Sequence, residues 1–227
     1  MAARRRRRPR RHRIARAPRR VVKLPLPPHR GELEFRPERL RAVSVAAVLW
    51  RVHRTSGEHV VPWNQLRCWG PASTMRFDPH QPPPQLQDRG VSYAALGTPT
   101  ALAEVFQRTR VINARRGSPY LTAWSATREL TLLDLTGTWP SQAGASYAIN
   151  TGRRNHCRAW ARVIHTARPE LDGLWYRSSM SGGDAVTLLT HAADSFPDRP
   201  RLSLPLDHPG LRGHLLAAAS QIAYRVV

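Results

Sequence analysis

The stretch VSYAALGTPTALAEVF, residues 91–106, decides the fold because it joins two kinds of secondary structure within sixteen residues. Its first part, residues 91–96, has the β-branched and aromatic content that is typical of a strand. Thr98 and Pro99 then predict the start of a helix, with Thr98 as its N-cap and Pro99 at its first position. Apolar residues at helical spacing extend this helix to about residue 108. A strand that leads directly into a helix indicates a domain of mixed α/β class.

Elements of both kinds continue on either side of this stretch. Residues 50–54 (WRVHR) alternate apolar and charged side chains and end a first predicted strand, whereas the prolines within residues 81–89 predict a loop. Further along, the patterns predict strands at residues 129–136, 174–176 and 186–190, and helices at residues 154–167 and 211–224. We therefore expect one α/β (α+β mixed) domain from about residue 43 to residue 227.

The N-terminal end has a different composition. Residues 1–20 contain eleven arginines and no acid, about half of the excess behind the formal net charge of +21. Little in residues 1–41 can be buried and prolines recur there, so we expect a disordered arginine-rich tail and linker. The tail is a nucleic-acid-binding arm, a segment without a role, or extra sequence from an upstream start codon, and we favour the last two. Non-specific binding to nucleic acid that weakens with salt is still expected.

Several classes of protein are excluded by the sequence. No apolar run reaches the ~20 residues of a membrane-spanning helix, and no signal-peptide core follows the basic start, so we expect a cytoplasmic protein without a membrane partner. Cys68 and Cys157 form no CxxC pair, and the ten histidines show no HExxH spacing. Neither a disulfide framework nor a metal site is therefore expected.

Four blocks of sequence carry a resemblance to a known family. They are residues 49–54 (LWRVHR), residues 75–79 (MRFDP), residues 91–93 with 100–105 (VSY and TALAEV), and residues 172–178 (DGLWYRS). In this order they resemble the RES domain, a family named for an arginine, a glutamate and a serine. The resemblance covers about residues 45–195, and the order and spacing of the blocks are more specific than any one block.

The resemblance implies a fold related to ADP-ribosyltransferases and an enzyme that cleaves the bond between nicotinamide and ribose in NAD⁺. NAD⁺ would be the substrate, with no bound cofactor. Glu104 would be the carboxylate that stabilises the cationic ribose as this bond breaks, because a fixed negative charge favours an oxocarbenium-like species. Arg76, with Arg51, would anchor the pyrophosphate through the forked donors of the guanidinium.

Two further roles follow from the same resemblance. Tyr93 would stack on nicotinamide or its ribose, and Ser178 would donate a hydrogen bond to ribose or phosphate. The neighbouring Ser179 competes with Ser178 for the position of the naming serine. Each candidate also has a structural interpretation. Glu104 could be a solvated carboxylate on a helix, and Arg76 and Arg51 could be surface charges. Tyr93 could be a core residue, and Ser178 could be a turn residue.

The family resemblance implies a toxin held in check by a helix-turn-helix antitoxin. Water, phosphate or a protein side chain can capture the same ribosyl cation, so the sequence leaves hydrolysis, phosphorolysis and ADP-ribosyl transfer open. A hypothesis from another class is a non-enzymatic nucleic-acid-binding protein that acts through its arginine-rich head. The absence of aromatic residues among those arginines argues against it.

Overall fold

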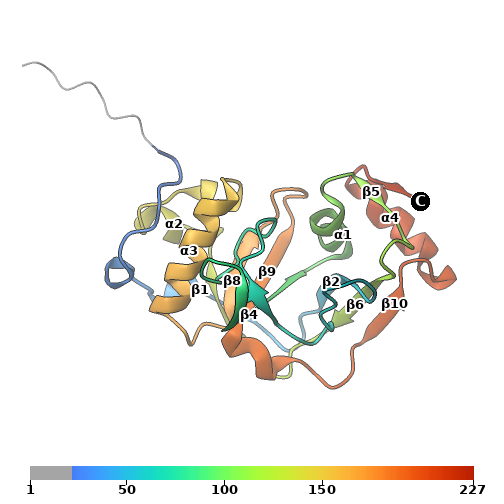
Figure 1. Cartoon of the computed structure of the whole chain (residues 1–227), viewed down its shortest axis with the longest axis horizontal. Helices are drawn as coiled ribbons and strands as arrows, with labels where there is room; N and C mark the ends of the chain where they lie inside the picture. Colours follow the sequence, from blue (N-terminus) through green and yellow to red (C-terminus); the bar gives the residue numbers. More distant parts are fainter. Residues whose placement is uncertain (1–21) are drawn as a thin grey trace, which may run out of the picture.

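The computed structural model describes residues 22–227 as a chain of short helices and strands (Figure 1). Residues 1–21 lie outside the described residues, so the disordered tail expected there stays a prediction. The strands are β1 (Leu40–Val43), β2 (Leu49–Arg54), β3 (Arg67–Gly70), β4 (Gln85–Ala95), β5 (Val111–Ile112), β6 (Pro119–Trp124), β7 (Leu130–Asp134), β8 (Gly173–Arg177), β9 (Asp184–Leu189), β10 (Leu202–Pro205) and β11 (Arg225–Val226).

Four α-helices and five short 3-10 helices complete the described part of the chain. The α-helices are α1 (Thr98–Phe106), α2 (Trp139–Gln142), α3 (Arg154–Ala167) and α4 (Arg212–Gln221). The 3-10 helices are η1 (Arg30–Glu32), η2 (Pro37–Arg39), η3 (Tyr147–Asn150), η4 (Thr190–Ser195) and η5 (Pro209–Leu211).

One nine-stranded sheet has the order β1-β7-β8-β9-β4-β2-β6-β10, with β3 paired to β4. Its pairs are antiparallel except for β7 and β8. Strands β5 and β11 form a small parallel sheet of their own. A large mixed sheet with helices packed on it is the α/β class that the sequence predicts.

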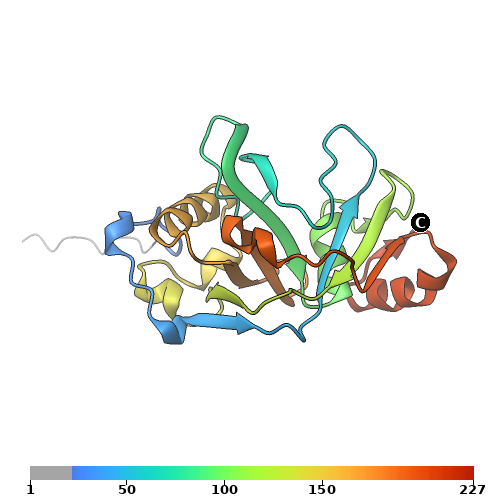
Figure 2. The ribbon, with the colours of Figure 1, turned by 90° about the horizontal axis from the view of Figure 1, so that it is seen from below.

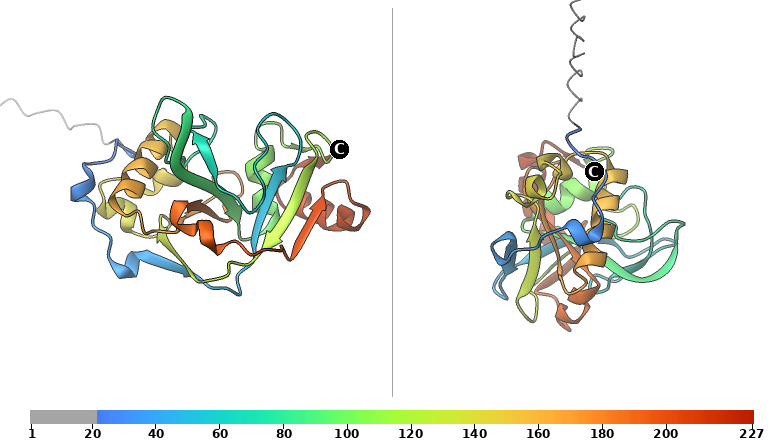
Figure 3. Two further views of the ribbon diagram at one scale, coloured as in Figure 1. Left: turned by 60° about the horizontal axis from the view of Figure 1, so that its bottom comes forward. Right: turned by 90° about the vertical axis from the view of Figure 1, so that its left-hand side faces the viewer.

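The sheet divides into two halves between β4 and β2. These strands are in register only at the pair Trp50 and Ala95, whereas β2 pairs with β6 over six residues and β4 with β9 over five. Beyond that pair β4 and β2 run apart, as the views in Figures 2 and 3 show. The gap in hydrogen bonding leaves room for side chains of both strands to face a common space.

Each half of the sheet has a hydrophobic cluster of its own, and a third cluster, which includes Leu49, Trp124 and Trp175, packs across both halves. Helix α3 buries Cys157, Trp160, Ala161 and Ile164 at i, i+3, i+4 and i+7 against β7 and β8 on one side. On the other side, α1 and α4 pack with β2 and β6 around a second cluster that includes Leu102, Leu121 and Leu215. In Figure 1, α2 and α3 stand apart from α1 and α4, with β4 and β9 between them.

The structure departs from the prediction of a disordered linker for residues 22–41. Leu24 and Leu33 are buried in the core beneath α3. The backbone of this segment also accepts hydrogen bonds from two indoles, Trp160 to the carbonyl of Pro25 at 2.9 Å and Trp139 to that of Glu34 at 2.8 Å. Apolar burial and satisfied buried donors therefore order residues 22–36, which we call the strap.

Two local predictions are corrected at β4 and α1. Strand β4 begins at Gln85, directly after the last proline, so residues 85–89 are not the loop that the prolines predicted. The N-cap of α1 is Gly97, not Thr98, and no side chain caps the helix. The Thr98 hydroxyl instead lies 2.9 Å from Nε2 of His214 on α4, which ties the start of α1 to the C-terminal helix.

Candidate functional site

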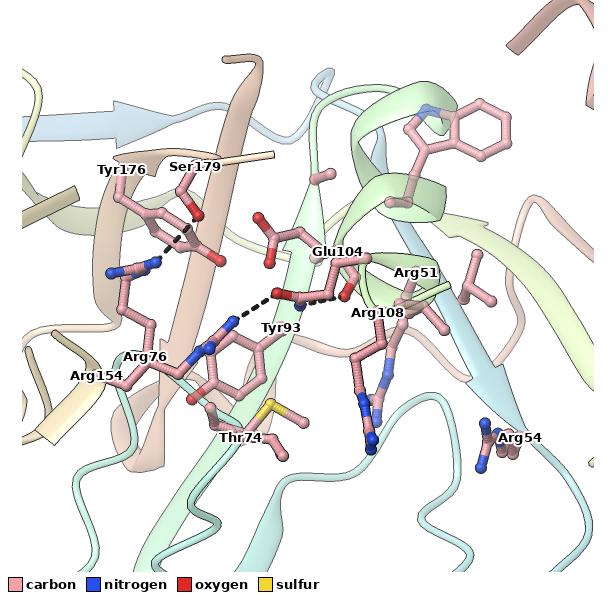
Figure 4. A pocket seen from close by; sticks show the side chains of 18 residues that line it. Arg51, Arg54, Thr74, Arg76, Tyr93, Glu104, Arg108, Arg154, Tyr176 and Ser179 are labelled. Carbon is pink, nitrogen blue, oxygen red and sulfur yellow. Dashed lines mark hydrogen bonds between the residues drawn. The ribbon is translucent and has the colours of Figure 1, made fainter. Parts of the chain in front are cut away.

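A cavity of about 440 Å³ occupies the space where β2 and β4 run apart (Figure 4). Side chains from β2, β4, α1, the loop before β4 and the start of α3 line it. The lining residues used below are Arg51, Arg54, Arg76, Tyr93, Glu104, Gln107, Arg108, Arg154, Tyr176 and Ser179. Of the five residues predicted to form a site, four line this cavity, and the fifth, Ser178, lies directly behind it.

Glu104 on α1 and Ser178, which follows β8, are in contact. Ser178 Oγ lies 2.6 Å from Glu104 Oε1, although 74 residues separate them in the sequence. Ser178 is 3% exposed, and its oxygen also accepts hydrogen bonds from the backbone N–H groups of Met180 and Ser181 at 3.1 and 3.2 Å. Because these two N–H groups use the lone pairs of the Ser178 oxygen, its hydroxyl proton is donated to the Glu104 carboxylate. Ser178 therefore holds Glu104 in place from behind the cavity.

Ser179 faces the other way from Ser178. It is exposed and lines the cavity, and its Oγ accepts a hydrogen bond from Nη2 of Arg76 at 3.0 Å. The other end of the Arg76 guanidinium donates from Nη1 to the carbonyl of Gly152 at 2.6 Å and to Cys157 Sγ at 3.5 Å. Arg76 forms no ion pair with any carboxylate among residues 22–227, so its charge is free for an anion in the cavity.

Asp78 fixes the loop that carries Arg76. Its buried carboxylate accepts hydrogen bonds from the Ala72 N–H and Arg67 Nη2, both at 2.7 Å, and from the N–H of His80 at 3.1 Å. The Nδ1 atom of His80 lies 2.5 Å from the same carboxylate. Although burial alone would raise it, these hydrogen bonds and the charge of Arg67 hold the pKa of Asp78 well below its usual range.

Arg51 is a half-buried cation without a counterion among the described residues. Its Nη1 atom donates to the carbonyl of Trp63 and to Ser92 Oγ, both at 2.9 Å. Burial, with a smaller effect of the nearby Arg67 charge, lowers its pKa from 12.5 to about 10, so the guanidinium stays protonated at neutral pH. A desolvated cation held by neutral groups favours an anionic ligand, because an anion would offset the cost of burying the charge.

Tyr93 and Tyr176 stand between Arg76 and Glu104 in the close view of Figure 4. Burial, reinforced by nearby negative charge, raises the pKa of both phenols well above the usual value, so both stay neutral. The hydroxyl oxygen of Tyr93 is buried and makes no hydrogen bond with the described residues. Such an orphaned donor indicates a place for a polar ligand atom.

Five of the ten lining residues named above were not assigned by the sequence patterns. They are Arg54, Gln107, Arg108, Arg154 and Tyr176. Tyr176 carried a usable signal, because it lies on β8 within the block at residues 172–178 that carries the family resemblance. Arg154 carried none: its Nη2 reaches Gln107 Oε1 at 2.5 Å only because the start of α3 and the end of α1 both border the cavity.

The charge of the lining is strongly unbalanced, with five arginines and one carboxylate, Glu104. The described residues contain no group of His, Cys, Asp and Glu side chains suited to a metal ion. Within the same residues, no helix has the length and apolar character needed to cross a membrane. The cavity therefore combines an excess of anion-binding donors with one fixed carboxylate and neutral aromatic rings.

Comparisons with known proteins agree with this description. A family model described as "RES domain" matches residues 48–207. A similar solved structure is the crystal structure of the MbcT–MbcA toxin–antitoxin complex of M. tuberculosis, with 17% sequence identity and a TM-score of 0.51 over 78% of this chain and 92% of that one. At this identity the likeness shows the fold alone. No curated protein sequence matches the chain.

Proposed function

Because this chain belongs to the RES domain family, we propose that its cavity binds NAD⁺ and cleaves the bond between nicotinamide and ribose. The observation that supports this most directly is the contact of 2.6 Å between Ser178 and Glu104 at the wall of a cavity rich in arginine. One immobilised carboxylate in a cationic pocket suits a substrate that is anionic overall and gains positive charge at one carbon during the reaction.

The chemistry assigns Glu104 to the reacting ribose. The C1′–N bond breaks with its electron pair passing to the ring nitrogen, which neutralises the pyridinium and releases nicotinamide. The positive charge left on the ribose is stabilised by the Glu104 carboxylate, held in position before the reaction starts. An oxygen of water or phosphate then bonds to C1′, and an attacking water gives up its proton to the surrounding water. Ser178 acts as a positioning residue for Glu104 and does not reach the substrate.

The remaining residues would bind and orient the dinucleotide. Arg76 and Arg51 supply guanidinium donors for the pyrophosphate, which matches their lack of carboxylate partners in the described chain. Tyr93 and Tyr176 would pack against nicotinamide or its ribose, with the unpaired Tyr93 hydroxyl offering a donor. Ser179, through its bond to Arg76, would keep that guanidinium turned into the cavity.

We further propose that the protein acts in the cytoplasm as the toxin of a toxin–antitoxin pair, restrained by a helix-turn-helix antitoxin. The likeness to one chain of a toxin–antitoxin complex supports a toxin of this fold. Transfer of ADP-ribose to a protein uses the same ribosyl cation and differs only in the group that captures it.

The direct test is to mix the purified protein with NAD⁺ and follow free nicotinamide, with and without inorganic phosphate. Formation of ADP-ribose indicates hydrolysis, ADP-ribose 1″-phosphate indicates phosphorolysis, and label retained on protein indicates transfer. Wild-type protein that releases no nicotinamide under any of these conditions would overturn the proposal. Release at an undiminished rate by Glu104→Gln would overturn the role of Glu104.

A further inference from the structure

The arginines of the cavity form two groups on either side of Glu104. In the view of Figure 4, Arg76 and Arg154 lie towards Tyr176 and Ser179, and Arg51, Arg54 and Arg108 lie on the opposite side. Arg51 and Arg54 come from β2, and Arg108 follows the end of α1. The two groups thus flank Glu104 in this view, and Arg54 and Arg108 both belong to the group that contains Arg51.

The members of these groups differ in how their donors are used. Arg76, Arg51 and Arg154 each donate to protein oxygens, which fixes their guanidinium groups. Arg54 and Arg108 are exposed, and within residues 22–227 their side chains make no hydrogen bond or ion pair. Two guanidinium groups at the rim of the cavity therefore keep all their donors available for a ligand.

NAD⁺ has no further anionic group that could bind Arg54 and Arg108. Its pyrophosphate is met by Arg76 and Arg51 in the function proposed above, and its pyridinium ring is positively charged, which offsets part of that anion. A phosphate ester adds roughly −1.5 to −2 charge at neutral pH and three acceptor oxygens. Guanidinium forks match such oxygens, and arginine is the residue by which dinucleotide sites accommodate a 2′-phosphate.

We propose that Arg54 and Arg108 receive the 2′-phosphate of NADP⁺, so that this cavity accepts NADP⁺ in preference to NAD⁺. The inference rests on the proposed function for the placement of the dinucleotide. The chemistry recognised is a phosphate dianion, which a phosphate ester or free inorganic phosphate can supply, and the experiments below separate these sources.

The first experiment measures binding without turnover. Isothermal titration of the full chain compares AMP with adenosine 2′,5′-bisphosphate, which differs from it by the 2′-phosphate. We expect the bisphosphate to bind about tenfold more tightly, as for a charged hydrogen bond. This preference should disappear in Arg54→Gln/Arg108→Gln and persist in Arg199→Gln/Arg201→Gln, a matched loss of charge at exposed arginines outside the cavity. Equal binding of both ligands by the wild type, or a preference that survives in the Arg54/Arg108 variant, would overturn the proposal.

The second experiment compares nicotinamide release from NADP⁺ and NAD⁺ in phosphate-free buffer. A higher kcat/KM for NADP⁺ that depends on Arg54 and Arg108 is expected. If phosphate instead accelerates cleavage of NAD⁺, and only the Arg54/Arg108 variant loses that acceleration, the pair serves free phosphate and the proposal is wrong. If neither dinucleotide is cleaved while the bisphosphate still binds through these arginines, the proposed cleavage fails and the phosphate site stands.

Discussion

The Ser178 hydroxyl holds the Glu104 carboxylate across 2.6 Å, and both side chains reach this contact from elements on different parts of the chain, β8 and α1. The serine follows the last residue of its strand, and its backbone turns there to satisfy the same hydroxyl. A carboxylate positioned in this way needs little reorganisation when positive charge develops beside it.

Removing either partner of this contact should lower turnover to different extents. We expect Glu104→Gln to reduce kcat for nicotinamide release by about 10²- to 10³-fold, the range for losing one fixed electrostatic group. Ser178→Ala should cost about tenfold or more in kcat with little change in KM, because the carboxylate loses one charged hydrogen bond but remains present. Ser220→Ala, on the exposed face of α4, is the control. Equal activity of Ser178→Ala and wild type would remove Ser178 from its positioning role.

Substitutions of Arg76 should act on substrate binding. Arg76→Lys keeps the charge but cannot donate to Gly152, Ser179 and a phosphate at once, so we expect KM for NAD⁺ to rise about tenfold. Arg76→Gln should raise KM further, because it also removes the charge. Steady-state kinetics with Arg201→Gln as a surface control measures both effects. A KM for Arg76→Gln within twofold of the wild-type value would contradict this role.

The strap should support Arg76 from outside the region matched by the family model. Leu24 packs against Gly152, leaving no room for a Cβ atom there, and the Gly152 carbonyl accepts the Arg76 hydrogen bond. We expect Leu24→Ala to reduce the free energy of unfolding by about 2–5 kcal/mol, as for a buried leucine, and to raise KM. Leu26→Ala changes an exposed leucine two residues away and should do neither. Urea unfolding and steady-state kinetics on both variants test this prediction. If Leu24→Ala and Leu26→Ala have the same free energy of unfolding and the same KM, the strap does not support Arg76.

Deleting residues 1–21 should separate the basic head from the folded domain. This deletion removes eleven arginines but leaves Leu24 in place, so we expect elution from heparin at lower salt with nicotinamide release unchanged. Deletion through residue 35 also removes Leu24 and Leu33 and should lower stability as well. Retention on heparin that does not change after the first deletion would assign the anion binding to the folded domain.

Stability should fall in mild acid because of two histidines. Burial, together with the charge of Arg51, lowers the pKa of His53 from 6.5 to about 4, and burial with the charge of Arg89 does the same for His165. The unfolded chain takes up these protons near pH 6.5 and the folded chain only near pH 4, so stability is lost as pH falls through that window. The double variant His53→Gln/His165→Gln should lose less stability than wild type between pH 7.5 and pH 5 in urea unfolding. Identical losses would show that other groups carry the effect.

Local patterns in the sequence were sufficient to predict those helices and strands whose apolar residues recur at a regular spacing. The apolar positions of α3 predicted residues 154–167, the bounds that the structure shows, because one buried stripe fixes a helix. The strap could not be found in this way. Leu24 and Leu33 stand among prolines without any period, and they are buried by a cluster whose other members, such as Trp139 and Trp160, lie far along the chain.

The site was predictable where the family pattern names a residue and unpredictable where contacts are tertiary. Glu104 and Arg76 were proposed through their blocks, and both line the cavity, whereas their roles stay predictions. The sequence could not show that Ser178 contacts Glu104 while Ser179 contacts Arg76. Both serines follow the end of a strand, and the direction of each side chain there depends on how the backbone turns after the strand.

Strands β2 and β4 are paired at one position only, between Trp50 and Ala95. A third apolar cluster, with Leu49 of β2, Trp124 of β6 and Trp175 of β8, packs across both halves, so side chains and not a hydrogen-bond ladder hold β2 and β4 together beyond this pair. Ala95 is 1% exposed, belongs to the cluster around Leu102 and also lines the cavity, so a bulky replacement there would overpack that cluster and narrow the cavity together.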